Sequence, residues 1–474
     1  MAYYGELASK VNHTNIVTDV EILRSLRSMT SSEKIGDCLI TGPFTRPPRP
    51  LVAPIFPETV ITIDGGIVMS PSQGTFSQTG VTFGRIAWVE MDTRKYENLA
   101  KEGTISASKM SGLIRDSGYK NFVLPARGST LDGFDTVGES FRSQCHKILS
   151  CPIRVFEDET STVCLMETLA MLSSMKEDVI AGVPDQIEIE CPTCGLAPLP
   201  VEWRKTFDKC TECGSVVFGA DVLMLWPEVH DYINDSQPAL RFLNVVERIL
   251  SILIIENIRR NYPHRLGKTC IVTDGPLAVF GGPHWLHNPI DKYLRLVSEA
   301  SKDAGWGNPL VIGLQKSGQV VEHFESVKAI IEPDSVMVLN DDYRRLFIGD
   351  GYVPERGFGY ESYYGSTFAY HSKYRDTYVF CLPFPIARSI GQEQFSAVTG
   401  YLESYADLPR ALSLIDCFRC DRYNNAIVPV ALANDMASIN PANGGRSLDS
   451  LVHVATLSSS QAHENVGEAN NGRV

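Results

Sequence analysis

Short apolar runs alternate with turn residues along this chain, and two of these runs are almost alike. Residues 59–63 and 270–273 are β-branched and apolar, which predicts two buried strands. Each run leads directly into an Asp-Gly pair, at Asp64 and at Asp274. Asp-Gly is also a common turn signal, so a single pair of this kind says little about function. Two of them, each at the end of an apolar strand, suggest a paired-carboxylate site.

The rest of the apolar pattern predicts strands and helices of ordinary length. Further strands are expected at 79–91, 309–314, 335–339 and 376–382, and residues 120–124 form a short apolar run. Helices are expected at 134–149, 160–175, 240–260, 291–302, near 392–404 and at 426–439, with a loop at 280–290. The expected fold class is therefore α/β.

The two ends of the chain differ in composition from its centre. Residues 1–58 combine a helical pattern in 1–37 with a proline-rich stretch at 42–57, which must be extended or looped. Residues 441–474 are rich in Asn, Gly and Ser and are expected to be loose. We therefore expect one large domain at 59–440.

The composition is that of an ordinary globular protein, with 43% hydrophobic and 21% charged residues in 474. The N-terminus shows no apolar signal segment. The longest apolar stretch, 240–258, is interrupted by charged side chains, which favours a buried helix over a membrane span. We therefore expect a cytoplasmic protein without a membrane partner.

Charge and cysteine content restrict the function further. A net charge of −13 disfavours binding to nucleic acid by bulk electrostatics alone, so either the basic groups are local or a partner holds the nucleic acid. Twelve cysteines in a chain of this kind favour thiols or metal ligands over disulfides. One Cys-x-x-Cys pair, Cys417 and Cys420, has no second pair to match it, and we interpret it as two ordinary thiols.

Two other Cys-x-x-Cys pairs have the spacing of a zinc ribbon. Fifteen residues separate the pairs, and a glycine follows each pair, where it supplies a turn. A redox role is the alternative, but two matched pairs favour a structural zinc site without an open coordination position. The predicted ligands, within a ribbon at 186–220, are Cys191, Cys194, Cys210 and Cys213.

A third carboxylate lies on the apolar stripe of the helix predicted at 240–260. Glu247 shares that helical face with Leu243 and Leu250. A carboxylate in an apolar setting needs a compensating charge, either a metal ion or a buried arginine. We interpret Glu247 as a third ligand beside Asp64 and Asp274, with the buried ion pair as the alternative.

Two further groups are candidates for the same site. Lys316 follows the strand at 309–314, where it could pair with a phosphate or with the carboxylates; a solvated hairpin lysine is the alternative. Asp435 lies in an apolar helix near the C-terminus and could provide another oxygen ligand. Its alternative role is that of a helix cap.

The order of these motifs resembles that of the NurA nuclease family. The resemblance spans about residues 55–440 and includes Asp-Gly-Pro-Leu at 274–277, Gly-Leu-Gln-Lys-Ser-Gly at 313–318 and the Pro-x-x-Leu-Ala pattern at 429–433. It implies a ribonuclease H-like mixed sheet flanked by helices over 59–440. The zinc ribbon is no general mark of that family, so we interpret 186–220 as an insertion.

The resemblance also implies an activity and partners. It implies a homodimeric deoxyribonuclease that uses manganese or magnesium and works with a HerA-type hexameric DNA-translocating ATPase, in DNA repair or antiviral defence. Asp64, Glu247 and Asp274 match the family's metal ligands. The chain departs from the family at Gly66, where a serine is usual, and at Asn434-Asp435, where a histidine is usual.

Two other functions compete with a DNA nuclease. One is a catalytically weak adaptor that caps a HerA-type motor. The other is an actin-like ATPase, which also places Asp-Gly turns at nucleotide phosphates. Its phosphate loop needs a hydroxyl that the segment 64–67, Asp-Gly-Gly-Ile, lacks, so we disfavour this function.

Overall fold

The computed structural model describes most of the chain between residues 18 and 439. The described residues are 18–28, 37–48, 56–71, 79–100, 112–156, 162–175, 179–180, 182–233, 236–349, 357–420, 425–439 and 448. The chain divides into two compact units, Met1–Phe44 and Thr45–Val474. In the first unit the described residues form α2 (Val20–Ser28) and α3 (Asp37–Thr41), and α2 falls within the predicted helical stretch. The predicted loose tail at 441–474 lies almost wholly outside the described residues.

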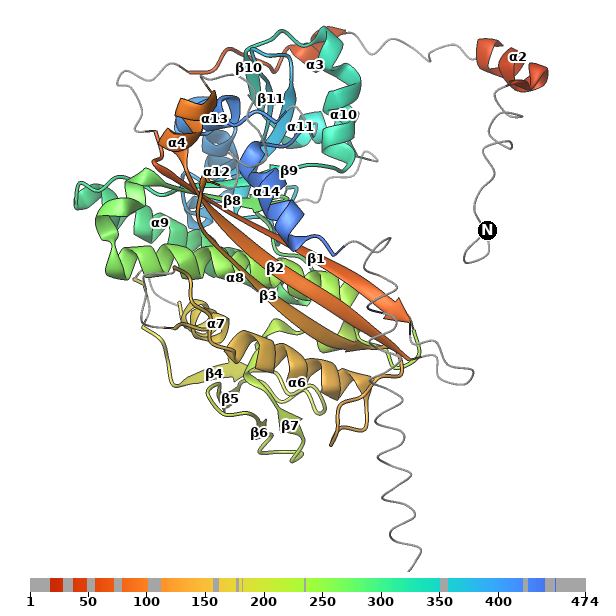
Figure 1. The fold of residues 1–474 in the computed structure, drawn as a ribbon, viewed down its shortest axis with the longest axis vertical. Helices are drawn as coiled ribbons and strands as arrows, with labels where there is room; N and C mark the ends of the chain where they lie inside the picture. Colours follow the sequence, from red (N-terminus) through yellow and green to blue (C-terminus); the bar gives the residue numbers. More distant parts are fainter. Residues whose placement is uncertain are drawn as a thin grey trace, which may run out of the picture. The chain divides into compact units, whose positions relative to one another are not determined.

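An eight-stranded mixed sheet organises the second unit (Figure 1). Its strand order is β10-β11-β12-β9-β8-β1-β2-β3. The strands are β1 (Thr59–Pro71), β2 (Gly80–Asp92), β3 (Ile114–Ala126), β8 (Thr269–Asp274), β9 (Leu310–Gln315), β10 (Ser335–Val338), β11 (Gly365–His371) and β12 (Thr377–Pro383). Only β1, β8 and β9 pair in parallel; every other neighbouring pair in this sheet is antiparallel. This sheet and its flanking helices confirm the predicted α/β class.

The first strand is longer than the sequence predicts. β1 does not end before Asp64 but continues to Pro71, because β2 pairs with it along its whole length. Its parallel pairing with β8 does stop at Ile63, opposite Thr273. Asp64 is therefore a residue inside a strand, placed one position beyond the point where β1 and β8 separate. The Asp-Gly sequence marks the end of one ladder and not the end of the strand.

Helices cover both faces of the sheet. α8 (Gln237–Asn261) packs on the face that carries Ile61 and Ile271, whereas α14 (Val428–Ala437) shares its core with Val60 and Val272 on the other. Figure 1 shows α14 beside β1 and α8 running along β1 to β3. The other α-helices of this unit are α4 (Thr93–Ala100), α6 (Val137–Ser150), α7 (Leu165–Ser173), α9 (His287–Asp303), α10 (Gln319–Val327), α11 (Asp341–Phe347), α12 (Gln392–Thr399) and α13 (Leu408–Cys417).

Most predicted elements are present, and the differences involve short segments. β11, α10, α11 and α13 were not predicted, because short apolar runs do not distinguish strand from helix. The segment predicted as a loop at 280–290 contains a 3₁₀ helix at Gly282–Leu286 and the start of α9. None of the helices in the described part of the chain has the length and apolar character needed to cross a membrane.

A buried ion pair joins α6 to the segment that follows the predicted ribbon. Asp221 lies in the 3₁₀ helix η1 (Gly219–Leu223) and accepts hydrogen bonds from Arg142 Nε at 2.8 Å and Nη2 at 2.6 Å. Asp221 also accepts from the amide of Phe218 at 2.9 Å. Arg142 and Asp221 are 7% and 1% exposed. The pair therefore holds the end of the ribbon against the helical layer with very little solvent screening.

We expect Asp221→Asn to destabilise the fold. The substitution leaves the Arg142 guanidinium buried without its counter-charge, which should cost about 3–5 kcal/mol of unfolding free energy in urea titrations. Asp185→Asn is the matched control, because the Arg204–Asp185 pair is exposed and its loss should cost less than about 1 kcal/mol. Equal effects of the two substitutions would show that the buried pair does not anchor the ribbon.

Candidate functional site

Lys316 lies between the two predicted aspartates. Its Nζ atom is 3.1 Å from Asp64 Oδ2 and 2.9 Å from Asp274 Oδ2. Asp64 lies in β1, Asp274 ends β8, and Lys316 directly follows β9. These three strands are parallel neighbours, so the ends of β8 and β9 lie beside the point in β1 where its pairing with β8 stops. The structure thus brings together three of the predicted site residues, which lie far apart in the chain.

Of the two aspartates, Asp64 is the more deeply buried. Asp64 is 2% exposed, and its Oδ1 atom accepts a hydrogen bond from the amide of Gly65 at 2.8 Å. Burial, followed by the nearby charge of Asp274, raises the pKa of Asp64 to about 6, although Lys316 opposes this change. Burial alone would lower the pKa of Lys316, but Asp274 and Asp64 together raise it. Lys316 is therefore protonated at neutral pH and supplies the main positive charge beside the pair.

Glu247 is the least compensated acid of the site. It lies on α8, is 8% exposed, and burial raises its pKa to about 8. Its closest cationic atom is Arg248 Nη2, 4.0 Å from Glu247 Oε2. The charges of Asp64 and Asp274 raise its pKa further. A buried carboxyl group in this setting is neutral at pH 7 unless another cation reaches it.

Arg248 is a site residue that the sequence reasoning missed. It is 1% exposed and donates from Nη2 to the main-chain oxygen of Asp274 at 2.8 Å. Its Nε and Nη1 atoms are buried and have no hydrogen-bond partner among the described residues. The signal in the sequence was a second charged residue beside Glu247 on the same buried helix. Arg248 fixes the backbone at the end of β8 and brings positive charge to the cluster.

α14 contributes Asn434 to the site and not the predicted Asp435. Lys316 Nζ donates to Asn434 Oδ1 at 3.3 Å, whereas Asp435 is exposed on the same helix. The end of α14 is held in place by Arg85 of β2, which donates from Nη1 to the main-chain oxygen of Met436 at 3.2 Å. The sequence located the helix but did not reveal which of two adjacent polar residues points to the cluster.

Two glycines allow both helices to approach β1 closely. A Cβ atom on Gly65 would lie 2.5 Å from Leu243 Cδ1 and 2.9 Å from Glu247 Oε1 on α8. A Cβ atom on Gly66 would lie 2.7 Å from the main-chain oxygen of Ala437 at the end of α14. Adjacent residues of a strand point to opposite faces, so each glycine makes room for a different helix. The close approach of α14 therefore requires glycine at position 66. This is the position at which the NurA family, which the sequence resembles, usually has serine.

The donor set fits a hard divalent cation in its chemistry. Carboxylate oxygens are the ligands preferred by Mg²⁺ and Mn²⁺, and a bound cation would oppose the rise in pKa that burial imposes on Asp64 and Glu247. The three carboxylates do not form a compact ligand set, however. Among the residues that the structure describes, only the four cysteines place at least three donor atoms within 4.8 Å of one another. Metal binding by Asp64, Glu247 and Asp274 therefore stays a prediction.

The four cysteine sulfurs converge as the ribbon spacing predicts. They lie at the ends of two hairpins, β4–β5 (Gln186–Ile189 and Leu199–Glu202) and β6–β7 (Asp208–Lys209 and Val216–Val217). Cross-pair sulfur distances are 3.7 Å for Cys191–Cys213 and for Cys194–Cys210. Gly195 and Gly214 have φ of 73° and 74°, which the turn after each pair requires. Four thiols in this arrangement can hold a zinc ion with all four tetrahedral positions filled.

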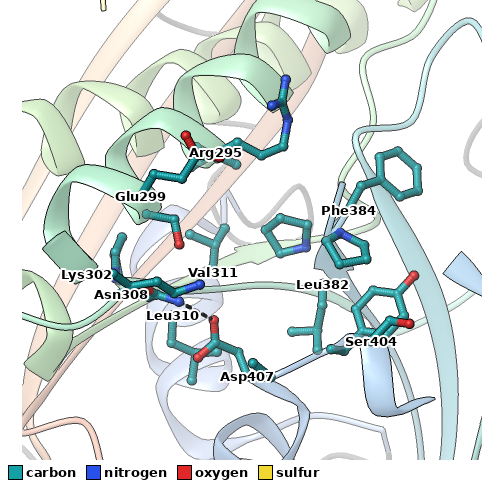
Figure 2. Close-up of a pocket in the computed structure, with 17 residues that line it drawn as sticks. Arg295, Glu299, Lys302, Asn308, Leu310, Val311, Leu382, Phe384, Ser404 and Asp407 are labelled. Atoms are coloured by element: carbon teal, nitrogen blue, oxygen red, sulfur yellow. Dashed lines mark hydrogen bonds between the residues drawn. The ribbon is translucent and has the colours of Figure 1, made fainter. Parts of the chain in front are cut away.

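A separate cavity of about 160 Å³ lies between α9, β9 and the end of β12 (Figure 2). None of the carboxylate cluster lines it. Several of its polar groups have partners: Asn308 donates to Asp407 at 3.4 Å, as the dashed line in Figure 2 shows, and Arg295 pairs with Asp291. We therefore assign the chemistry to the cluster around Lys316 and not to this cavity.

Comparison with known proteins gives a structural likeness. Neither a protein-family model nor a curated protein matches the chain. Among solved structures the chain is similar to the NurA nuclease from Sulfolobus solfataricus, with 9% identity and a TM-score of 0.31 over 97% of this chain and 98% of that one. A TM-score this low supports no argument about fold or activity, so a functional conclusion must come from the residues of the site.

We expect Cys191→Ser to release the zinc ion. Loss of one of four thiolates removes a ligand from a closed tetrahedral site, so the purified variant should contain much less than one equivalent of zinc by elemental analysis. Cys420→Ser is the control, because Cys420 lies outside the convergent set. A full equivalent of zinc in Cys191→Ser would contradict the assignment.

The buried Glu247 should make stability depend on pH. Its pKa of about 8 lies above the ordinary value of 4.5, so between these values the folded protein retains a proton that the unfolded chain has lost. Without added divalent cations, stability should therefore fall as pH rises from 5 to 8, by roughly a few kcal/mol. Urea titrations of Glu247→Gln should show a smaller fall. Glu393→Gln is the control, because Glu393 is exposed, and its unfolding free energy should depend on pH as in the parent. The same pH dependence in Glu247→Gln would refute the prediction.

Proposed function

We propose that this chain is a metal-dependent deoxyribonuclease that hydrolyses phosphodiester bonds at the Lys316 cluster. The observation that carries the proposal is the convergence of Asp64 and Asp274 on Lys316 where the parallel pairing of β1, β8 and β9 stops. Glu247, buried on the covering helix, adds a third carboxyl group. Several carboxylates from separate elements, with one retained cation, are what a phosphate-cleaving metal site needs.

The chemistry follows from the charge balance of the cluster. A divalent cation held by Asp64, Glu247 and Asp274 would activate water and offset negative charge on the leaving oxygen. Asp64 and Glu247 would bind it as carboxylates, so their protons must leave, and cation binding should strengthen as pH rises. Arg248 holds the main-chain oxygen of Asp274 and so maintains the position of that residue.

Lys316 and a cation compete for the same carboxylate oxygens. Nζ of Lys316 contacts both aspartates, so a bound cation requires it to give up at least one of these contacts. Asn434 Oδ1, at 3.3 Å, offers a neutral acceptor on the opposite helix. In this proposal the ammonium turns toward Asn434 and becomes available to a phosphate oxygen of the DNA.

The proposed partner is a HerA-type hexameric ATPase. The support is the motif order in the sequence together with the net charge of −13, which is unfavourable for holding DNA without help. A motor that grips and feeds DNA would supply this missing attraction. A homodimer, the use of Mn²⁺ or Mg²⁺, and a role in DNA repair or antiviral defence belong to the same proposal.

A catalytically weak adaptor is the second candidate function. The observation that favours it is the position of Lys316, which already pairs with both aspartates, together with carboxylates that do not form a compact ligand set among the described residues. Such a chain would cap the motor ring without cutting DNA. Activity of the parent protein in the presence of the ATPase and Mn²⁺ distinguishes the two functions.

We expect Asp64→Asn and Asp274→Asn to abolish metal-dependent DNA cleavage. Loss of a ligand charge should lower the rate at least about 100-fold in assays with Mn²⁺ and the ATPase, because even groups that only support a metal ligand contribute 10–100-fold. Asp303→Asn, an exposed acid on α9, is the matched control and should cleave like the parent.

The same assay tests the remaining assignments. Asn434→Ala should lower cleavage more than Asp435→Asn, because only Asn434 contacts Lys316 in the cluster. If the parent binds the ATPase but cleaves no DNA with either metal, the adaptor function is correct. Full activity in Asp64→Asn would place the chemistry elsewhere in the chain.

A further inference from the structure

A second cavity, of about 430 Å³, lies at the β10–β11 end of the sheet. The end of β10, the start of β11, α11, the loop at 357–363 and the beginning of α12 contribute to its wall. None of the carboxylate cluster around Lys316 lines it. Its volume falls in the range of small-molecule sites, about 300–1,000 Å³.

One wall carries a buried arginine that forms no salt bridge with a described residue; the nearest acid of the cavity wall, Asp341, acts on it only through its charge. Arg344 is 7% exposed, and its Nη2 atom donates to Thr367 Oγ1 at 3.1 Å. Its guanidinium carbon lies 3.8 Å from the ring centre of Phe358. No carboxylate of a described residue forms a salt bridge with it. Arginine stays protonated even when burial lowers its pKa, so this wall presents a positive charge that the nearby Asp341 offsets only in part.

A second arginine lines the same cavity. Arg388 donates to the main-chain oxygens of Tyr360 and Tyr363 and lies over the rings of Phe384 and Phe395, at 4.8 and 5.4 Å. Among the described residues, no carboxylate lies in salt-bridge contact with it, although the charge of the nearby Asp291 acts on it and opposes the lowering of its pKa by burial. The cavity therefore has two guanidinium groups held in place without a direct ion pair to a described residue.

One acid, Asp341, belongs to the cavity wall. Its Oδ1 atom accepts from the amide of Phe358 at 3.2 Å, so this carboxylate is engaged by the loop at 357–363. Two guanidinium groups therefore face one lining carboxylate. Gly391, the N-cap of α12, and Gln392, its first residue, also line the cavity, and the start of a helix favours an anion.

Aromatic side chains form much of the remaining wall. They are Phe358, Tyr360, Tyr363, Phe384 and Phe395. Flat π-faces of this kind stack on planar rings, and nucleobases are planar rings that every aromatic side chain can accept. Positive charge and aromatic faces thus occur together in one small-molecule-sized cavity.

We propose that this cavity binds a mononucleotide, with its phosphate at Arg344 and Arg388 and its base against the aromatic side chains. Guanidinium groups match phosphate oxygens in geometry as well as in charge. The limited volume favours a free nucleotide over a strand of nucleic acid. The proposal is independent of the hydrolytic chemistry, because the two sites share no residue.

Calorimetric titration of the full chain with AMP, GMP, CMP and UMP tests this proposal. At least one nucleotide should bind saturably, and its nucleoside and inorganic phosphate should each bind about tenfold more weakly or not at all, because each provides only half of the contacts. Absence of binding by all four nucleotides overturns the proposal. If inorganic phosphate binds as tightly as the nucleotide, the cavity is an anion site that does not recognise the base, and the proposal is also overturned.

A matched pair of substitutions locates the binding. Gln392 and Gln394 are both exposed on α12, but only Gln392 lines the cavity. Gln392→Glu should weaken nucleotide binding about tenfold through like-charge repulsion, whereas Gln394→Glu should leave it unchanged. Arg344→Gln should also abolish binding, and thermal unfolding confirms that the variant is folded. Equal nucleotide affinities of Gln392→Glu and Gln394→Glu would place the nucleotide elsewhere and overturn the proposal. Displacement of the bound nucleotide by a single-stranded oligonucleotide would identify a nucleic-acid groove instead.

Discussion

The contacts of Lys316 with Asp64 and Asp274 are the interaction on which the candidate site depends. Two carboxyl groups at the ends of apolar strands repel each other and lose hydration, so they need a positive charge between them. The parallel pairing of β1, β8 and β9 supplies this charge, because it brings the residue after β9 to the edge where β8 ends. Arg248 and Glu247 extend the same cluster from the covering helix. The arrangement of charges, more than any single residue, defines the site.

The sheet can carry this cluster because β1 has no side chains at two consecutive positions. Gly65 makes room for α8 on one face, and Gly66 makes room for α14 on the other. A side chain at either position would push one helix outward and take Glu247 or Asn434 away from Lys316. The tight packing of protein interiors makes such shifts costly. The Asp-Gly-Gly sequence thus functions here as a point of close helix approach within a continuous strand.

The sequence predicted several of the residues that come together better than it predicted how they are arranged. The zinc ligands could be predicted because the paired spacing of Cys191 to Cys213 is a local signal, and their sulfurs converge in the structure. Asp64, Asp274 and Lys316 were found because each follows an apolar run. The continuation of β1 could not be predicted, since it depends on pairing with β2 over its full length. Arg248 and Asn434 were missed because their roles depend on the orientation of α8 and α14, which only tertiary packing determines.

The cluster joins residues that a ribosome makes at very different times. The contact of Asp64 with Lys316 spans 252 positions, and the contact of Lys316 with Asn434 spans another 118. Since synthesis proceeds from the N-terminus, β1, which includes Asp64, is made well before its counter-charge. Until β9 has joined the sheet, the early part of the chain can bury that acid only at an energetic cost or in its protonated form. The charged edge of the sheet can therefore be completed only after most of the polypeptide exists.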